Sequence, residues 1–305
     1  MNTPLGPDSP TLRQLELLLA LASADGIASA GAKIGMTPSA TSHALRALET
    51  TLGVQLIDRN APRVELTHAG QQVLPHVRDL FAALHLIQAT ASASVGLKSG
   101  VLKIGSFGLS SSLRLLPPLL GQFRRLYPGI DLRVFEKADA EIEQDLIERR
   151  LEIGVVTLPK PEFDTVAIAL DELVAVVPVG HELAGVDTVD AHQLARHPFI
   201  LTHAGSQGLV ARMFSRAEVA PTVRHELSQM LSILDFVARG EGVSVVASLA
   251  LPEQYAGVAY KPIRPATSRR VGLACLNESR LSPAAAAFWK QARLLAKKKG
   301  VSIAG

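Results

Sequence analysis

The apolar and polar residues at the start of the chain recur with the spacing of two short helices. Thr11 and Gln14 form the pattern of a capping box, and leucines then line one face of a helix that stops before Gly26. A second helix is expected over about 29–34, and Gly35 suits the left-handed position that follows a helix end. The spacing therefore predicts a helix, a turn and a short helix.

A third helix follows after a tight turn. Thr37 can cap it, Pro38 suits its first turn, and Gly53 is expected to stop it. The face expected to pack inward consists of Ala40, Ala44, Ala47, Leu48 and Thr51. The opposite polar face consists of Ser39, Ser42, His43 and Arg46. A small polar face of this kind lets a helix enter the major groove of DNA, although an ordinary solvated face has the same pattern.

The segment after Gly53 has the pattern of a small hairpin. Two short apolar runs, 54–57 and 64–66, flank a turn bracketed by Arg59 and Arg63. These arginines could reach the DNA backbone or the minor groove. The acidic neighbours that could pair with them instead are Asp58 and Glu65. The hairpin predicts the wing of a winged helix-turn-helix.

A long helix is expected from His68 to about Ser94, with Thr67 as its cap and Pro75 as a possible kink. Its apolar stripe consists of Leu74, Val77, Leu80, Phe81, Leu84, Ile87 and Ala91. Because such a helix has no core of its own to face, a partner helix is the favoured solution, and we expect a dimerisation linker. The alternative is packing against the C-terminal half.

From residue 101 onward the pattern changes to strands alternating with helices. The expected strands are 101–106, 131–135, 153–157, 173–177, 199–202, 223–227, 243–246 and 271–276. The expected helices are 112–126, 140–150, 208–217, 228–239 and 283–298. This order predicts two α/β lobes with a cleft, the second lobe being inserted between parts of the first.

Composition sets the broad class but does not locate the DNA-binding end. The chain has 305 residues, 48% of them hydrophobic, which suffices for two or three folding units. Its net charge is +3, yet residues 1–96 hold six basic against seven acidic residues. No run of about eighteen apolar residues predicts a membrane span, and no secretion signal is recognisable. Cys275 is the single cysteine, which fits a reduced cytoplasm.

The N-terminal residues resemble the signature of the LysR-type transcriptional regulators. The resemblance covers Thr37 to Glu49 and continues through Leu52-Gly53, Leu56, Arg59 and Leu66-Thr67-His68-Ala69-Gly70. Weaker landmarks lie in the C-terminal half, at Leu115-Leu116-Pro117, Tyr127-Pro128, 151–154 and 240–243. Two departures are Ile57, where the family usually has phenylalanine, and Arg149-Arg150, where it usually has glycine.

The resemblance implies a multidomain α/β protein. The expected domains are a winged helix-turn-helix over 1–66, a linker helix over 67–95 and a two-lobed, periplasmic-binding-protein-like effector domain over 96–305. Lobe 1 would comprise about 96–160 and 267–305, and lobe 2 about 161–266. The family implies a dimer or tetramer that binds double-stranded promoter DNA and changes its contacts with RNA polymerase when a small molecule enters the cleft.

Two sets of residues are therefore candidates for function. The candidate DNA contacts are Thr37, Pro38, Ser39, Thr41, Ser42, His43, Arg46, Arg59 and Arg63. The candidate effector contacts are Ser106, Phe107, Ser110, Ser111, Asp139, Thr202, His203, Ser206 and Ser228. The latter follow strands of the two lobes, where open α/β sheets bind ligands, and Ser110 falls near a family effector contact by resemblance. Each serine could also be only a helix cap.

Other classes of protein fit the sequence less well. The hydroxyls, with His203 as the basic group and Phe107 as an apolar wall, suit a small carboxylate or another polar metabolite. The two lobes alone would fit a cytoplasmic small-molecule binding protein, but the DNA-binding head opposes that interpretation. An enzyme is disfavoured because the nucleophile-elbow, phosphate-loop and dinucleotide motifs are missing. His192 and His197 lack an obvious third ligand, so no metal or cofactor is expected.

Overall fold

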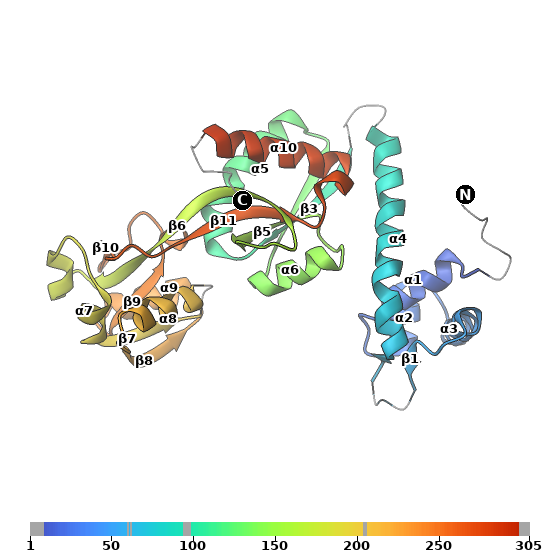
Figure 1. The fold of residues 1–305 in the computed structure, drawn as a ribbon, viewed down its shortest axis with the longest axis horizontal. Coiled ribbons are helices and arrows are strands. Elements are labelled where there is room, and N and C mark those ends of the chain that lie inside the picture. Colours follow the sequence, from blue (N-terminus) through green and yellow to red (C-terminus); the bar gives the residue numbers. More distant parts are fainter. Residues whose placement is uncertain (1–8, 60, 62, 94–98, 204–205, 299–305) are drawn as a thin grey trace. The chain divides into compact units, whose positions relative to one another are not determined.

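The computed structural model describes residues 9–59, 61, 63–93, 99–203 and 206–298, which form two compact units divided at Gln88 and Ala89. The elements of the first unit are α1 (Leu12–Leu21), α2 (Ile27–Lys33), α3 (Pro38–Leu52), β1 (Ile57–Asp58), β2 (Glu65–Leu66) and most of α4 (His68–Ala93). Strands β1 and β2 pair antiparallel (Figure 1). This is the winged helix-turn-helix that the sequence predicts.

Local capping explains where these helices begin and end. Thr11 and Gln14 form the expected capping box, in which the Gln14 Oε1 atom accepts from the Thr11 amide at 2.8 Å. The Thr37 hydroxyl accepts from the Ala40 amide at the start of α3. Gly35 and Gly53 have φ angles of 71° and 69°, the left-handed conformation expected after a helix. These four positions are confirmed, whereas α2 begins at Ile27 and ends at Lys33, slightly before the expected bounds of about 29–34.

The inward face of α3 differs from the one that its apolar residues predict. The buried residues are Thr41, Leu45, Leu48 and Glu49, whereas Ala40 and Thr51 are exposed. Thr41 and Glu49 can be buried because their polar atoms are satisfied: the Thr41 hydroxyl donates to the Thr37 carbonyl at 2.8 Å, and a Glu49 carboxylate oxygen accepts from the Leu56 amide at 2.9 Å. The predicted inward face was therefore wrong by about one position.

Helix α4 contributes its first half to the core of the N-terminal unit. Leu74 and Val77 are buried in a cluster with Leu18, Leu48 and Leu56. Further along, Leu80 and Ile87 are 38% and 64% exposed. The expectation that this helix has no core to face is therefore wrong for its first turns, and only its later apolar residues lack a covering among the described residues.

The second unit is built on one continuous mixed sheet. Its strands are β3 (Gly100–Ser106), β4 (Ile130–Glu136), β5 (Ile153–Leu158), β6 (Asp164–Pro178), β7 (Pro198–Thr202), β8 (Thr222–Leu227), β9 (Val243–Ala247), β10 (Val258–Pro262) and β11 (Ser268–Cys275). The order is β4-β3-β5-β11-β6-β9-β7-β8, with β10 paired to β6. Strands β3, β4 and β5 are parallel neighbours, as are β7, β8 and β9. Two parallel cores are thus joined by the antiparallel pair of β6 and β11.

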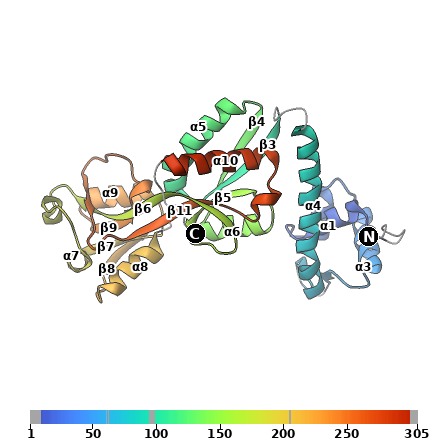
Figure 2. The same ribbon diagram turned by 45° about the horizontal axis from the view of Figure 1, so that its top comes forward.

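Helices cover both faces of each half of this sheet. Their bounds are α5 (Leu116–Leu126), α6 (Asp139–Ile147), α7 (Ala191–Ala195), α8 (Gln207–Arg216), α9 (Met230–Ala238) and α10 (Pro283–Lys298), with short turns η1 (Ser110–Leu115), η2 (Glu182–Gly185), η3 (Ser248–Ala250) and η4 (Glu278–Arg280). In lobe 1, α5 and α10 share a core on one face, and α6 packs on the other (Figure 2). Phe123 and Trp289 are among the largest fully buried side chains. The predicted two-lobed architecture is confirmed.

Several elements extend or depart from the expected ones. Strand β6 has 15 residues, and its first part, including Val166 and Ile168, packs in the core of lobe 1, whereas Leu173 belongs to the core of lobe 2. The passage between lobes therefore lies within β6. The expected helix over 112–126 is divided into η1 and α5, and the sequence did not predict β10 or α7.

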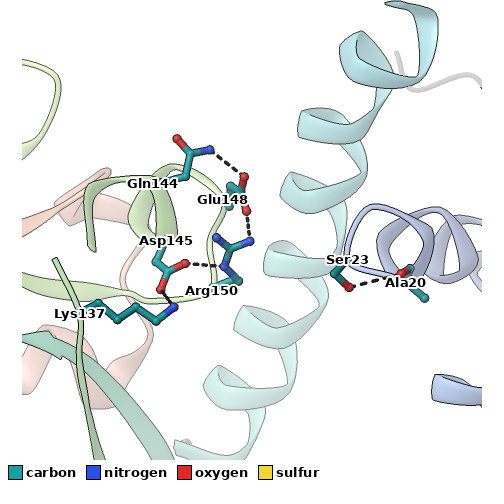
Figure 3. Close-up of polar contacts among 7 residues, drawn as sticks. All are labelled: Ala20, Ser23, Lys137, Gln144, Asp145, Glu148 and Arg150. Atoms are coloured by element: carbon teal, nitrogen blue, oxygen red, sulfur yellow. Dashed lines mark hydrogen bonds and ion pairs between the residues drawn. The ribbon is translucent and has the colours of Figure 1, made fainter. Parts of the chain in front are cut away.

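The departure at Arg149-Arg150 has a local explanation at the end of α6. Arg149 has a φ of 57°, the left-handed conformation in which glycine is usual. Arg150 donates to both Asp145 and Glu148, and Lys137 donates to Asp145 at 2.6 Å (Figure 3). Burial raises the pKa of Asp145, but these donors outweigh it and hold that pKa below its usual range. Ion pairing thus stabilises a helix end that lacks glycine.

Candidate DNA-contacting face and effector-binding loops

The polar face of α3 is presented to solvent in the N-terminal unit. Ser39, His43 and Arg46 are exposed and Ser42 is half-buried; we call these four residues the reading face. The Arg46 Nε atom donates to the Ser42 carbonyl at 3.3 Å, which leaves the terminal guanidinium nitrogens for other acceptors. Thr37 and Pro38 are exposed at the beginning of the helix. This arrangement can supply hydroxyl, imidazole and guanidinium groups to DNA.

Thr41 was expected to contact DNA, and the structure contradicts that expectation. Its side chain has no exposed surface, and its hydroxyl already donates to the Thr37 carbonyl. It lies against α2, where a Cβ atom built on Gly31 would be 1.8 Å from the Thr41 Oγ1 atom. Thr41 therefore holds α2 and α3 in close contact instead of contacting a ligand.

Two basic residues that were not predicted to matter position the helix-turn-helix. Arg13 of α1 donates to the Ile34 carbonyl at the end of α2, and the Lys33 ammonium donates to the Ser23 carbonyl at 2.5 Å. The Ser23 hydroxyl in turn donates to the Ala20 carbonyl at the end of α1 (Figure 3). These contacts join residues up to 21 positions apart, so sequence periodicity could not reveal them.

The two wing arginines have different surroundings. Arg59 donates to the Glu49 carboxylate at 2.7 Å, and the same carboxylate accepts from the Leu56 amide. This pair ties the wing to α3, although Arg59 stays half exposed. Arg63 is exposed and forms no ion pair with the described residues. Arg63 is thus the freer of the two candidate contacts.

In lobe 1, the predicted effector loop between β3 and η1 is a closed network of serines. The Ser106 hydroxyl bonds to those of Ser111 and Ser112, and Ser112 donates to Glu136 at 2.6 Å. Ser106 and Ser111 have no exposed surface, and Ser110 is 3% exposed. Ser106 and Ser111, which the sequence suggests as effector contacts, are thus buried and hydrogen-bonded within the loop in this conformation. Phe107 and Ser112 are only half-buried and reach the surface.

A buried ion pair beneath this loop was not predictable from the sequence. Arg269 of β11 donates to the Asp171 carboxylate of β6 from two nitrogens, at 3.0 and 3.2 Å, and to the Ser110 hydroxyl at 3.2 Å. Its guanidinium carbon lies 5.0 Å from the centre of the Phe107 ring. Asp171 also accepts from the Leu249 amide at 3.0 Å. The pair therefore connects β6 and β11, the two strands that join the lobes, to the β3–η1 loop.

In lobe 2, the predicted effector loop after β7 also has both buried and exposed candidate residues. Thr202 has no exposed surface and Ser206 is 2% exposed, so both of these expected contacts are buried in this conformation. His203 and Ser228 are exposed. The His203 ring bonds to Glu226 at 2.9 Å and to Gln207 at 3.2 Å. The hydrogen bond to Glu226 raises the pKa of His203. Residues 204 and 205 lie outside the described range.

Asp139 is the other candidate with an unusual environment. It begins α6, with two residues between it and the end of β4, and its Oδ1 atom is buried with no partner among the described residues. Burial, followed by the nearby Glu143 carboxylate, raises the pKa of Asp139. A carboxyl group in this state is suited to donate to, or accept from, a polar ligand.

The charged side chains that the structure describes near the predicted loops do not form an open site for an anion. Arg269 is paired with Asp171, Lys137 with Asp145 and His203 with Glu226. A carboxylate ligand at these loops would have to compete with an existing carboxylate for each of these cations. The arrangement thus favours polar, hydrogen-bonding groups over a strong negative charge.

Other kinds of site are not evident among the described residues. No group of three histidine, cysteine or acidic side chains is placed to hold a metal ion in the described part of the chain. None of the described helices combines the length and apolar character that a membrane span requires. Cys275 is buried, and burial raises the pKa of its thiol to about 12. A thiolate at neutral pH is therefore disfavoured.

Comparison with known proteins agrees with both units. Residues 12–71 match the model of bacterial regulatory helix-turn-helix proteins of the lysR family, and residues 96–296 match the LysR substrate binding domain. The probable HTH-type transcriptional regulator LrrA of Synechococcus elongatus is 30% identical over 91% of this chain and 94% of its own length. The similarity to this regulator thus extends over nearly the whole chain.

Solved structures show the same fold. A full-length OxyR variant of Pseudomonas aeruginosa has a TM-score of 0.72 at 22% identity, with 94% of each chain covered. Full-length CbnR in complex with its target DNA has a TM-score of 0.64 at 21% identity, covering 93% of this chain and 99% of that one. Together with the two family matches, these findings show that the chain belongs to the LysR family of transcriptional regulators.

Proposed function

We propose that the reading face of α3 enters the major groove of promoter DNA. Ser39, Ser42, His43 and Arg46 would contact base edges or phosphates, with Thr37 and Pro38 near the backbone. The observation that carries this proposal is that the polar face is exposed while the opposite face, with Thr41 and Leu48, is buried. CbnR, which shares the fold, was solved with its target DNA. Arg59 and Arg63 would contact the flanking backbone or minor groove.

The chain would act as a dimer or a pair of dimers. The exposed apolar residues Leu80 and Ile87 of α4 support a partner helix along the second half of that helix. Two copies would place two reading faces on successive half-sites of a pseudo-palindromic promoter. Such a protein regulates transcription without catalysing a reaction, and it works in the cytoplasm, where it meets promoter DNA and RNA polymerase.

The effector of this regulator would bind between the β3–η1 loop and the β7–α8 loop. The candidates with side-chain surface or an unused polar atom are Phe107, Ser112, Asp139, His203 and Ser228. Ser110 is buried and its hydroxyl accepts from Arg269, so the effector would contact it only after a small movement of the loop. Because the cations near these loops are already paired, we favour a polar metabolite with several hydrogen-bonding groups as the effector. A small carboxylate is the alternative ligand to test beside it.

A gel-shift titration with the promoter region upstream of the chain's own gene tests the regulator. We expect specific binding whose affinity falls steeply with salt, because phosphate contacts release counterions. Arg46→Ala should weaken specific binding by about 1–3 kcal/mol if the guanidinium contacts a base. Arg124→Ala, an exposed arginine of α5 in the other unit, is the control and should bind as the wild type does.

Two results would contradict this proposal at different levels. Absence of salt-sensitive binding to that DNA would remove the assigned role of the reading face. Normal binding by Arg46→Ala on every promoter tested would remove only Arg46 from the contact set. Effector binding is measured separately, by calorimetry with a panel of small polar metabolites on the wild type and on His203→Ala. Equal binding by both proteins would remove His203 from the proposed effector contacts.

A further inference from the structure

A cavity that is open to solvent lies in lobe 2, away from the residues assigned to the effector loops. Its volume is about 330 Å³. Helix α8 supplies one wall, with Leu209, Arg212, Met213 and Arg216, and the segment leading into β11 supplies the other, with Ala266, Thr267 and Ser268. None of these residues belongs to the β3–η1 loop or to the β7–α8 loop. The cavity is therefore separate from the effector loops and lies between α8 and the segment that leads into β11.

The positive charge in this cavity has no partner in the described part of the chain. Arg212 and Arg216 are one helical turn apart on the same face of α8, and both are exposed. Neither guanidinium forms a hydrogen bond or an ion pair with any residue that the structure describes. By contrast, Arg239 at the end of the next helix is paired with Asp235 at 2.7 Å. Two adjacent guanidiniums with unused donors are suited to a doubly charged anion.

The opposite wall adds neutral donors. Thr267 and Ser268 line the same cavity, and their hydroxyls form no hydrogen bond with the described residues, while the Thr267 carbonyl accepts from the Leu173 amide at 2.8 Å. Glu172 is the direct β6 partner of Ser268 and is therefore an acidic residue next to this wall. No ion pair joins Glu172 to Arg212 or Arg216 in the described structure. The net charge offered by the lining side chains is therefore positive.

Size and apolar surface narrow the class of ligand. A volume of about 330 Å³ falls at the lower end of the range for small-molecule sites and exceeds what a bare inorganic ion fills. Leu209 and Met213 give the cavity an apolar side that a carbon skeleton can cover. We propose that this cavity binds a small organic dianion, a phosphomonoester or a dicarboxylate, with Arg212 and Arg216 on its charged groups and Thr267 and Ser268 on the other side.

The position of the cavity gives such a ligand a mechanical role. Ser268 directly precedes Arg269, whose guanidinium holds Asp171 and the Ser110 hydroxyl. A dianion bridging α8 and Ser268 would fasten lobe 2 to the first residue of the crossover strand β11. This second site would thus act on the same strand pair as the effector loops while sharing no residue with them.

Calorimetry on the full chain tests the proposal with glycerol 3-phosphate, succinate and inorganic phosphate as probes, and with acetate and glycerol as singly charged and uncharged comparisons. We expect one of the two organic dianions to bind at least tenfold more tightly than acetate and inorganic phosphate. The double variant Arg212→Gln/Arg216→Gln should weaken that binding at least tenfold, because two charge-assisted contacts are lost. Arg124→Gln, which changes an exposed arginine of α5 away from the cavity, is the matched control and should leave it unchanged.

Hydrogen exchange of the wild type provides a second readout that needs no variant. The bound dianion should slow exchange in peptides covering 207–216 and 264–268, with no change in the loop over 106–112. Failure of both organic dianions to bind at 10 mM, equal affinity for inorganic phosphate, or unchanged binding by the double variant would each overturn the proposal. His203→Ala should retain this binding, which separates the second site from the proposed effector loops.

Discussion

Replacing Arg269 by methionine tests how the buried ion pair supports the second unit. The Asp171 side chain is fully buried and that of Arg269 is 4% exposed. In Arg269→Met the Asp171 carboxylate loses two donors, at 3.0 and 3.2 Å, and keeps the Leu249 amide and the Ser248 hydroxyl. Methionine fills much of the volume, so the main loss is the countercharge.

The expected cost follows from leaving a carboxylate buried without its cation. Removing one partner of a buried pair typically costs about 3–5 kcal/mol. For a folding unit of roughly 200 residues, each kcal/mol lowers the midpoint of thermal unfolding by about 2–4 °C, so a decrease of about 6–20 °C is expected. Urea unfolding followed by circular dichroism, with calorimetry for the second unit, measures both quantities.

Two control variants make this expectation refutable. Arg239→Met removes a pair whose side chains are 70% and 45% exposed, and it should cost less than about 1 kcal/mol. The double variant Arg269→Met/Asp171→Leu should be more stable than Arg269→Met, because no charge remains buried. If Arg269→Met cost no more than Arg239→Met, or if the double variant were the least stable, the assigned energetics of the pair would be wrong.

The remaining predictions concern three local features. Gly31→Ala places a Cβ atom 1.8 Å from the Thr41 Oγ1 atom, so urea unfolding of the N-terminal unit should show a net loss of about 2 kcal/mol after the gain in helix propensity; Gly121→Ala, with open space around its Cβ atom, should show no loss. Arg149→Gly relieves the left-handed φ of 57° and should stabilise the second unit by about 1 kcal/mol, and Arg150→Gly, which removes ion pairs with Asp145 and Glu148, should destabilise it. In an NMR titration, the pKa of His203 should lie above about 6.5 and return toward that value in Glu226→Gln. The stabilising contribution of that pair should be complete below about pH 6.5 and disappear as the pH rises through the raised pKa; a wild-type pKa at or below 6.5 would contradict it.

Features set by neighbouring residues were predictable from the sequence. The capping box at Thr11, the cap at Thr37 and the left-handed glycines at 35 and 53 depend on contacts within four residues, and all lie where expected. The alternation of strands and helices predicted the two lobes for the same reason. The exposed part of the reading face followed from helical spacing alone.

Features set by distant partners were not predictable. Thr41 and Glu49 are polar, so a count of apolar residues assigned them to the surface, but a helical carbonyl and the Leu56 amide satisfy them inside. Asp171 interrupts the apolar run of β6 and hid the first part of that strand, because its partner Arg269 lies 98 residues away. Strand β10 contains a lysine and a proline, which suit an edge strand and weaken its pattern.

The pairing of β6 with β11 has a consequence for how such regulators diversify. Glu172 and Ser268 are direct partners across this antiparallel ladder, so the chain leaves lobe 1 and returns to it at neighbouring points roughly 5 Å apart. The segment between them, residues 173–267, is therefore an inserted cassette whose two ends lie side by side in the sheet. A cassette of this kind can be exchanged for another of different specificity without rethreading the rest of the domain, as insertions with adjacent ends generally can. Ligand preference and DNA preference can then change in separate evolutionary steps.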